Sequence, residues 1–361
     1  MNWLKGTFTL LLAIAFAIPG ASVDHSASGA QAVRGVPGSA EFGIGANLNL
    51  AGENLPAAVD LTGSMHLDWV AIDFPWSVYM PDADSNPDWS AFDRAIQATV
   101  KAGSAAMLSI SAPPVWAITP SGPDPSATVA LLKAILQRHP GVIQAVELFP
   151  SPNTLAGWGT GPNAGAYLAL YKSVKQSLSQ IQASVLLVAG GLEINSQKTN
   201  PNNVSAVDYL HSLYEDDPDL DIPIIGLRLK GIQGNPSDPV SVEPNQAFRQ
   251  YEDIRGLMAA SGRKNDLIWI TGLEFASPTT AGAQTDWLID AINQTRSQLY
   301  IGTVFLVSLN TCPAECAEAP LLGSNGNPFP IASILKNYLL QKTTQQSSYN
   351  PARTKNDFFR N

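Results

Sequence analysis

Charged side chains are scarce in this 361-residue sequence. They make up 14% of it, whereas about 25% is usual for a soluble protein. The 30 acidic residues outnumber the 21 basic ones, which gives a net charge of −9 at pH 7. No cluster of Lys and Arg is present to meet phosphate groups, so we expect no nucleic-acid partner.

Cysteine and histidine are also rare. The two cysteines, Cys312 and Cys316, lie in Thr-Cys-Pro-Ala-Glu-Cys, and the four histidines are scattered singly. A metal site would need more ligands close together, so we expect no metal and no cofactor. In an oxidising compartment, the cysteine spacing predicts a local disulfide between Cys312 and Cys316.

One apolar run near the N-terminus is too short to cross a membrane comfortably. It covers Thr7 to Ile18 and follows a single positive charge at Lys5. Small residues come next, with a cleavage site expected at Ala30-Gln31-Ala32 and a rival at Gly20-Ala21-Ser22. Residues 1–32 are therefore predicted to be a signal peptide, and the protein to be secreted or held in the cell envelope. An uncleaved N-terminal anchor is the alternative, and no other membrane contact is expected.

Short apolar runs alternate with helical patterns along the rest of the chain. Eight runs predict strands, at 42–48, 69–76, 105–110, 145–149, 184–191, 222–229, 267–271 and 300–309. Eight segments predict helices, at 54–64, 88–103, 126–140, 167–181, 204–214, 247–260, 285–299 and 331–340. Such alternation requires parallel strands with helices outside them.

Eight repeats in a chain of this length predict an α/β protein with one (β/α)8 TIM barrel. The barrel is expected over residues 41–342, after a linker at 33–40 and before a polar, disordered tail at 343–361. A doubly wound open sheet is the alternative. That fold needs a Gly-rich phosphate turn after an early strand, and the sequence has none.

A TIM barrel carries its functional residues at the C-terminal ends of its strands. Aromatic rings and side-chain amides gather at these predicted ends, and they suit a sugar, because rings stack on aromatics while amides bind hydroxyl groups. A carbohydrate or other glycan is therefore the expected partner. The predicted binding residues are Trp76, Trp116, Asn153, Asn195, Asn47 and Asn310. The alternative is that the two tryptophans only fill the barrel mouth.

The segment from Glu147 to Asn153 resembles the retaining glycoside hydrolases built on a TIM barrel, the clan that contains families 5 and 39. In that clan the segment usually reads Trp-Glu-Ile-Trp-Asn-Glu-Pro-Asn. Glu147 matches the first Glu, and Pro152-Asn153 match the last two residues. Ser151 stands where the resemblance implies the catalytic acid/base Glu.

The seventh predicted strand carries the second part of this resemblance. The clan supplies its nucleophile there in a Trp-x-Thr-Glu-x-Gly pattern, whereas this chain reads Trp269-Ile270-Thr271-Gly272. Retaining hydrolysis needs two carboxylates about 5 to 5.5 Å apart. Since the resemblance places Ser151 and Gly272 at those two positions, the leading hypothesis is an exported glycoside hydrolase-like barrel that binds carbohydrate or acts at the cell surface without this mechanism.

Two other functions stay open. An active glycoside hydrolase would use relocated carboxylates, Glu274 with Asp73 or Glu193, because an inverting mechanism tolerates a wider spacing. Glu147 lies too deep for that role and is expected to be a buried group, paired for example with Arg228. A purely structural envelope protein, with the barrel mouth closed by side chains, is the third hypothesis.

Overall fold

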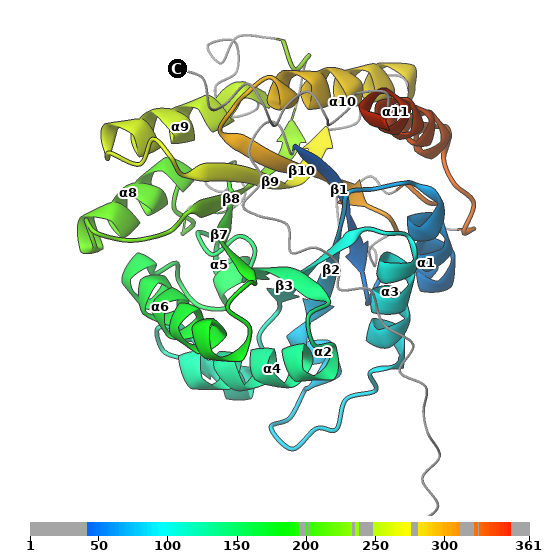
Figure 1. Cartoon of the computed structure of the whole chain (residues 1–361). Coiled ribbons are helices and arrows are strands. Elements are labelled where there is room, and N and C mark those ends of the chain that lie inside the picture. The colour runs from blue at the N-terminus through cyan, green and yellow to red at the C-terminus, as the bar shows by residue number, and fades with distance from the viewer. Residues whose placement is uncertain are drawn as a thin grey trace, which may run out of the picture. The chain divides into compact units, whose positions relative to one another are not determined.

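The computed structural model describes residues 42–194, 200, 202–232, 235–237, 248–275, 281–310, 321–323 and 325–347. They all belong to Val33–Asn361, the larger of the two units into which the chain divides. Eight parallel strands form a closed barrel with helices outside it (Figure 1). The predicted single (β/α)8 TIM barrel is confirmed.

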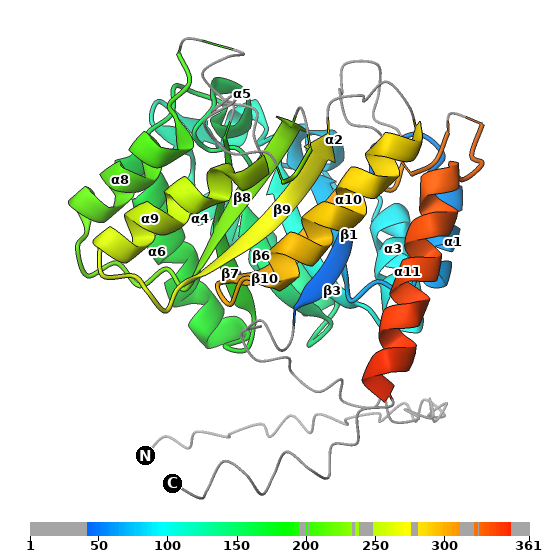
Figure 2. The ribbon, with the colours of Figure 1, turned by 90° about the horizontal axis from the view of Figure 1, so that it is seen from above.

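The barrel strands follow the predicted order with small shifts at their ends. They are β1 (Gly43–Asn49), β2 (Trp69–Pro75), β3 (Ala105–Ser111), β6 (Ile143–Leu148), β7 (Leu186–Glu193), β8 (Ile224–Ile232), β9 (Leu267–Phe275) and β10 (Ile301–Ser308). Figure 2 shows them from the side, with the helices around them. The larger helices are α1 (Leu55–Ser64), α3 (Ser90–Lys101), α4 (Pro125–Arg138), α6 (Ala164–Ile181), α8 (Ala206–Asp216), α9 (Tyr251–Ala260), α10 (Ala281–Arg296) and α11 (Pro330–Ser347).

The helices pack through stripes of apolar side chains at helical spacing. In α6 the buried stripe includes Tyr167, Leu170, Val174 and Leu178. None of the described helices is long and apolar enough to cross a membrane. The last helix, α11, continues to Ser347 and so enters the segment predicted to be a polar tail.

Helix α4 begins differently from the sequence prediction. Its N-terminal cap is Asp124, whose carboxylate accepts a hydrogen bond of 2.7 Å from the backbone N–H of Ala127. From the sequence alone, Ser126 is the expected cap of this helix. Pro125 suits the first helical position because its missing N–H is not needed there, which leaves the residue before it as the cap.

The N-terminal half of the barrel is filled by a plug of Trp69, Trp269 and Phe305. The two indole rings lie 5.1 Å apart, and Phe305 lies 6.5 Å from Trp69 and 6.1 Å from Trp269. Two glycines of β1 make room for these rings. A Cβ on Gly45 would come within 2.5 Å of Phe305, and one on Gly43 within 2.8 Å of Trp69. Because the rings fill this half of the barrel, a ligand site can form only at the C-terminal ends of the strands.

Short elements that the sequence did not predict shape the loops at those ends. They are α2 (Trp76–Tyr79), the 3-10 turn η2 (Val115–Ala117), the hairpin of β4 (Ile118–Thr119) and β5 (Gly122–Pro123), and α5 (Leu155–Trp158). The predicted helix at 247–260 is divided into the 3-10 turn η3 (Phe248–Gln250) and α9. Trp158 fixes two of these loops together. Its ring is fully buried, and its indole N–H donates to the carbonyl of Ser121 at 2.8 Å.

Candidate functional site

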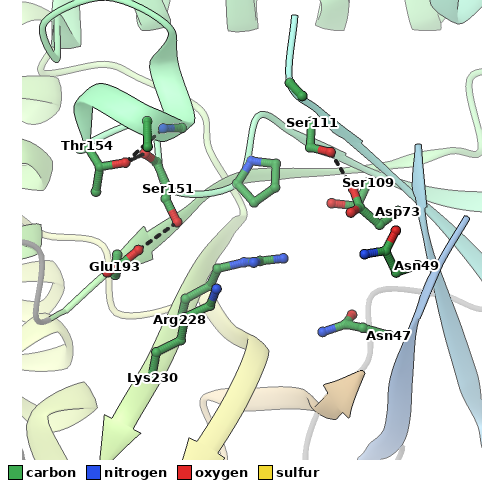
Figure 3. Close-up of a pocket in the computed structure, with 14 residues that line it drawn as sticks. Asn47, Asn49, Asp73, Ser109, Ser111, Ser151, Thr154, Glu193, Arg228 and Lys230 are labelled. Carbon is green, nitrogen blue, oxygen red and sulfur yellow. Dashed lines mark hydrogen bonds between the residues drawn. The ribbon is translucent and has the colours of Figure 1, made fainter. Parts of the chain in front are cut away.

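A polar cavity of about 400 Å³ lies at the C-terminal ends of the barrel strands, as the fold predicts (Figure 3). Residues from β1, β2, β3, β7 and β8, from the loops after β3 and β6, and from α5 form its wall. The lining residues are Asn47, Asn49, Asp73, Ser109, Ser111, Ala112, Pro150, Ser151, Thr154, Ala156, Gly157, Glu193, Arg228 and Lys230.

The backbone in the wall of the cavity, and directly beside it at Phe149, is strained. Ala112 (φ 47°), Phe149 (φ 51°) and Ser151 (φ 63°) have left-handed conformations that residues other than glycine seldom adopt. Hydrogen bonds hold the loop after β6 in place. In it, the backbone N–H of Phe149 donates to the carbonyl of Ile110, and that of Ser151 donates to the carbonyl of Gly191. Strain of this kind gathers at functional sites, so it marks this cavity independently of its side chains.

Two of the three predicted catalytic carboxylates line this cavity. Asp73 accepts a hydrogen bond of 2.6 Å from the Ser111 hydroxyl, and Glu193 accepts one of 3.1 Å from the Ser151 hydroxyl. The third, Glu274, lies on β9 with 7% of its surface exposed and does not line the cavity. The structure thus places Asp73 and Glu193 in the lining of one cavity and Glu274 outside that lining.

Glu147 lies beneath the cavity. Its side chain is 0% exposed, and its Oε2 atom accepts a hydrogen bond of 2.7 Å from the Ser109 hydroxyl. The Nη2 atom of Arg228 is 3.9 Å from the same oxygen. The prediction of a buried glutamate paired with Arg228 is therefore confirmed. Gly191 provides the space, because a Cβ there would lie 2.4 Å from the Oε1 atom of Glu147.

Arg228 also lies against Gly272, its partner in the register of β8 and β9. A Cβ on Gly272 would meet the Cγ, Nε and Cδ atoms of Arg228 at 3.5, 3.8 and 3.9 Å. The arginine stem therefore runs through the space beside Gly272. Lys230, two residues further along β8, lines the cavity as well.

The predicted amide residues have different surroundings. Asn47 lines the cavity and donates from its side chain to the carbonyl of Thr271 at 3.1 Å. Asn153 and Asn310 are fully buried, do not line the cavity and bond to neighbouring backbone. Asn195, like Cys312 and Cys316, lies outside the described residues, so its role and the disulfide stay predictions.

The predicted aromatic residues stand apart from the cavity lining. Trp76 is fully buried, and its ring meets that of Trp116 edge to face at 5.4 Å. Trp116 is 37% exposed, and its indole N–H donates to the carbonyl of Met80 at 3.0 Å. Val115, beside it, is 88% exposed. Trp76 thus packs against Trp116 from inside the protein, and Trp116 presents an apolar surface on the loop after β3.

Ser109 and Thr154 line the cavity although they are not among the site residues predicted from the sequence. Ser109 faces the cavity because it precedes Ser111 by two positions in β3, and alternate residues of a strand share a face. That spacing was a readable signal. Thr154 depends on the turn after Ser151, whose conformation no sequence pattern revealed. Within the described part of the chain, no three His, Cys, Asp or Glu side chains gather in a way that could hold a metal ion.

Solved structures share this architecture at low sequence identity. A family 39 glycoside hydrolase (GH39 enzyme) from Xanthomonas axonopodis pv. citri matches with a TM-score of 0.61 and 13% identity, over 85% of this chain and 68% of that one. A GH128 (subgroup II) endo-beta-1,3-glucanase from Sorangium cellulosum matches with a TM-score of 0.53 and 17% identity, over 81% and 97%. The fold is that of the TIM-barrel glycoside hydrolases.

A beta-glucosidase from Exiguobacterium marinum has the same glycoside hydrolase-like barrel, with a TM-score of 0.58, 9% identity and coverage of 84% and 98%. The resemblance read from the sequence is thus confirmed at the level of the fold. No protein-family model matches the chain, and no curated protein matches it either.

Proposed function

We propose that this protein is an exported glycan-binding barrel that does not use the double-glutamate mechanism of retaining hydrolases. The observation that carries this proposal is the contact between Arg228 and Gly272. The resemblance assigns the nucleophile to position 272, where the chain has no side chain and an arginine stem lies alongside. Ser151, at the position assigned to the acid/base, donates to Glu193.

The chemistry of the cavity supports sugar binding. Its carboxylates, amides and hydroxyl groups accept from or donate to sugar hydroxyls, and Asp73, Asn47 and Ser111 lie on one side while Glu193, Ser151 and Thr154 lie on the other (Figure 3). The surface of Val115 and Trp116, on the loop that begins at the cavity-lining Ala112, offers apolar contact to a further sugar ring.

Binding and hydrolysis can be tested together on the purified protein. Calorimetric titrations and a glycan array would include laminari- and cello-oligosaccharides, since the structural neighbours include a beta-1,3-glucanase and a beta-glucosidase. We expect binding without release of reducing sugar, and a weaker affinity in Trp116→Ala. Hydrolysis by the wild-type protein would contradict the proposal. Binding of no glycan would favour the structural envelope protein instead.

A second candidate function is hydrolysis by Asp73 and Glu193. Both line the same cavity, and β2 and β7 are separated by two strands, β3 and β6. The same number of strands, β7 and β8, separates β6 from β9, which carry the positions that the resemblance assigns to catalysis. In this case Asp73→Asn and Glu193→Gln would each abolish turnover. Glu274→Gln is the matched control, because Glu274 does not line the cavity.

A further inference from the structure

We infer that the cavity selects a glycan whose sugar carries a protonated amine, and that the carboxylate of Glu193 binds this ammonium group. The inference rests on the proposed glycan-binding function and names the class of glycan, an amino sugar. Two independent observations carry it. The hydroxyl groups of the cavity wall already donate their protons to the protein, and the charged groups in and beneath the cavity have an excess of negative charge.

Four hydroxyl groups of the described residues line the cavity, and each donates its proton to an oxygen atom of the protein (Figure 3). The pairs are Ser109 with Glu147, Ser111 with Asp73, Ser151 with Glu193, and Thr154 with the carbonyl of Ser151. Because a hydroxyl group has one proton, these four groups offer a ligand only the lone pairs of their oxygen atoms. An ammonium group has three donors and no acceptor, so it suits this wall better than a sugar hydroxyl, whose own lone pairs also need donors.

Glu193 presents a fixed carboxylate to the cavity. Among the described residues it has no ion-pair partner, and its carboxylate accepts a hydrogen bond of 3.1 Å from the uncharged hydroxyl of Ser151. The side chain of Asn153 bonds both the backbone N–H and the carbonyl of Glu193. Arg228, its register partner on β8, is attracted to the buried Glu147, which lies 3.9 Å from its Nη2 atom. The charge of Glu193 is therefore left for a ligand.

The sum of the charges around the cavity also favours a cation. Of the described residues, three carboxylates and two cationic groups line the cavity or lie directly beneath it, which leaves a formal excess of one negative charge. They are Asp73, Glu147, Glu193, Arg228 and Lys230. The whole chain carries a net charge of −9 at pH 7, so a cationic glycan is also attracted from a distance. A ligand that displaces water strengthens the interactions within the cavity, where an ammonium group offsets an excess that a neutral sugar leaves uncompensated.

Three oligosaccharides of equal length would test the inference. All are β-1,4-linked glucose polymers that differ only at C2 of each ring: cello-oligosaccharide has a hydroxyl group there, its chitin counterpart an acetamide, and its chitosan counterpart an amine. In calorimetry at a mildly acidic pH, we expect the amine form to bind about 10-fold or more tightly than the hydroxyl form, because a hydrogen bond to a charged group is stronger than a neutral one by about this amount. The uncharged acetamide form should not share the gain.

A pH series tests the charge of the ligand without any change to the protein sequence. Once the pH exceeds the pKa of the sugar amine, the ammonium group loses its proton, and its tighter binding should fall toward that of the hydroxyl form. The hydroxyl form is the reference at each pH, because it reports any change in the protein itself. A preference that persists when the amine is neutral would contradict the inference.

A variant would assign the preference to Glu193. Glu193→Gln keeps the shape of the side chain, removes its charge, and should remove most of the preference for the amine form. Glu215→Gln makes the same change at an exposed position on α8, outside the cavity lining, and should keep the preference. If Glu193→Gln does not fold, the pH series on the wild-type protein is the test. A preference that survives in a folded Glu193→Gln would reflect the net charge of the chain and would overturn the inference.

Two further results would contradict the inference in distinguishable ways. If the amine form binds no more tightly than the hydroxyl form, the preference for an amino sugar is wrong while glycan binding stands. If none of the three oligosaccharides binds, the proposed function and this inference both fail.

Discussion

Asn153 clamps the backbone of Glu193 through two hydrogen bonds. Its side-chain amide donates to the carbonyl of Glu193 at 2.9 Å, and its side-chain oxygen accepts the N–H of Glu193 at 2.9 Å. Asn310 holds Asn49 in the same way, with bonds of 2.9 and 3.0 Å. Each buried asparagine therefore fixes a cavity-lining residue on a neighbouring strand.

Removal of the first clamp should weaken both the fold and the site. We expect Asn153→Ala to lower the free energy of unfolding by about 2 to 3 kcal/mol, because it leaves buried backbone groups of Glu193 unsatisfied. Urea unfolding measures this loss. Asn163→Ala is the control; it removes an exposed helix cap and should cost only about 1 kcal/mol. Equal losses in the two variants would contradict the clamp.

Alanine substitutions at Gly191 and Gly231 should distinguish the energetic cost of backbone strain from that of a steric clash. Both have a positive φ, 71° and 63°, but a Cβ on Gly191 would strike Glu147, whereas one on Gly231 has no atom within 4 Å. Gly231→Ala should cost about 1 to 2 kcal/mol, the price of a left-handed alanine. Gly191→Ala should cost about 3 kcal/mol or more, because it also displaces a buried carboxylate. Thermal unfolding of the two variants checks the difference.

Restoring glutamates at the two substituted positions should not restore hydrolysis. In Ser151→Glu/Gly272→Glu the new carboxylate on β9 would lie against Arg228 and pair with it, and position 151 would carry a long side chain at φ 63°. We expect release of reducing sugar no faster than by the wild-type protein. Adding Arg228→Ala to this double variant should raise the rate. A double variant as active as the triple would show that Arg228 does not interfere.

Asp93 should make stability depend on pH in the acid range. Arg138 donates hydrogen bonds to it and lowers the pKa of its carboxyl below the usual value, and His139 adds to this effect. The stability that this pair contributes is present above the unfolded pKa of about 3.9 and is lost as the pH falls through the lower pKa of the folded state.

Replacing Asp93 should therefore matter at neutral pH and not in strong acid. Asp93→Asn should cost about 1 kcal/mol or less at pH 7, because the ion pair is partly exposed to solvent. The difference from the wild-type protein should shrink below about pH 4. Thermal unfolding at a series of pH values measures it. Asp60→Asn, on the exposed side of α1, serves as the control, and an Asp93 effect that grows in acid would contradict the assignment.

The fold could be predicted well from the sequence because buried parallel strands consist of continuous apolar runs. Each of the eight barrel strands overlaps a predicted strand, and the deep position of Glu147 followed from counting residues back from Ser151 along one strand. Those inferences depend on strand periodicity, which is local in the sequence.

The orientation of loop residues could not be predicted in the same way. Asn153 was expected to face a ligand because it follows a strand end, but the left-handed conformations of Phe149 and Ser151 turn the chain before it. Nothing in the residue types of that loop announces such a turn, since glycine is the usual signal for a positive φ. The role of Arg228 likewise depends on its contact with Gly272, which lies on the neighbouring strand β9 and far away in the sequence.

The aromatic plug of Trp69, Trp269 and Phe305 closes the barrel at its N-terminal end. A molecule held at the open end has one route of approach, which is also its route of departure. The two glycines of β1 that admit the plug thus also determine that a ligand of the cavity must enter and leave over the C-terminal ends of the strands.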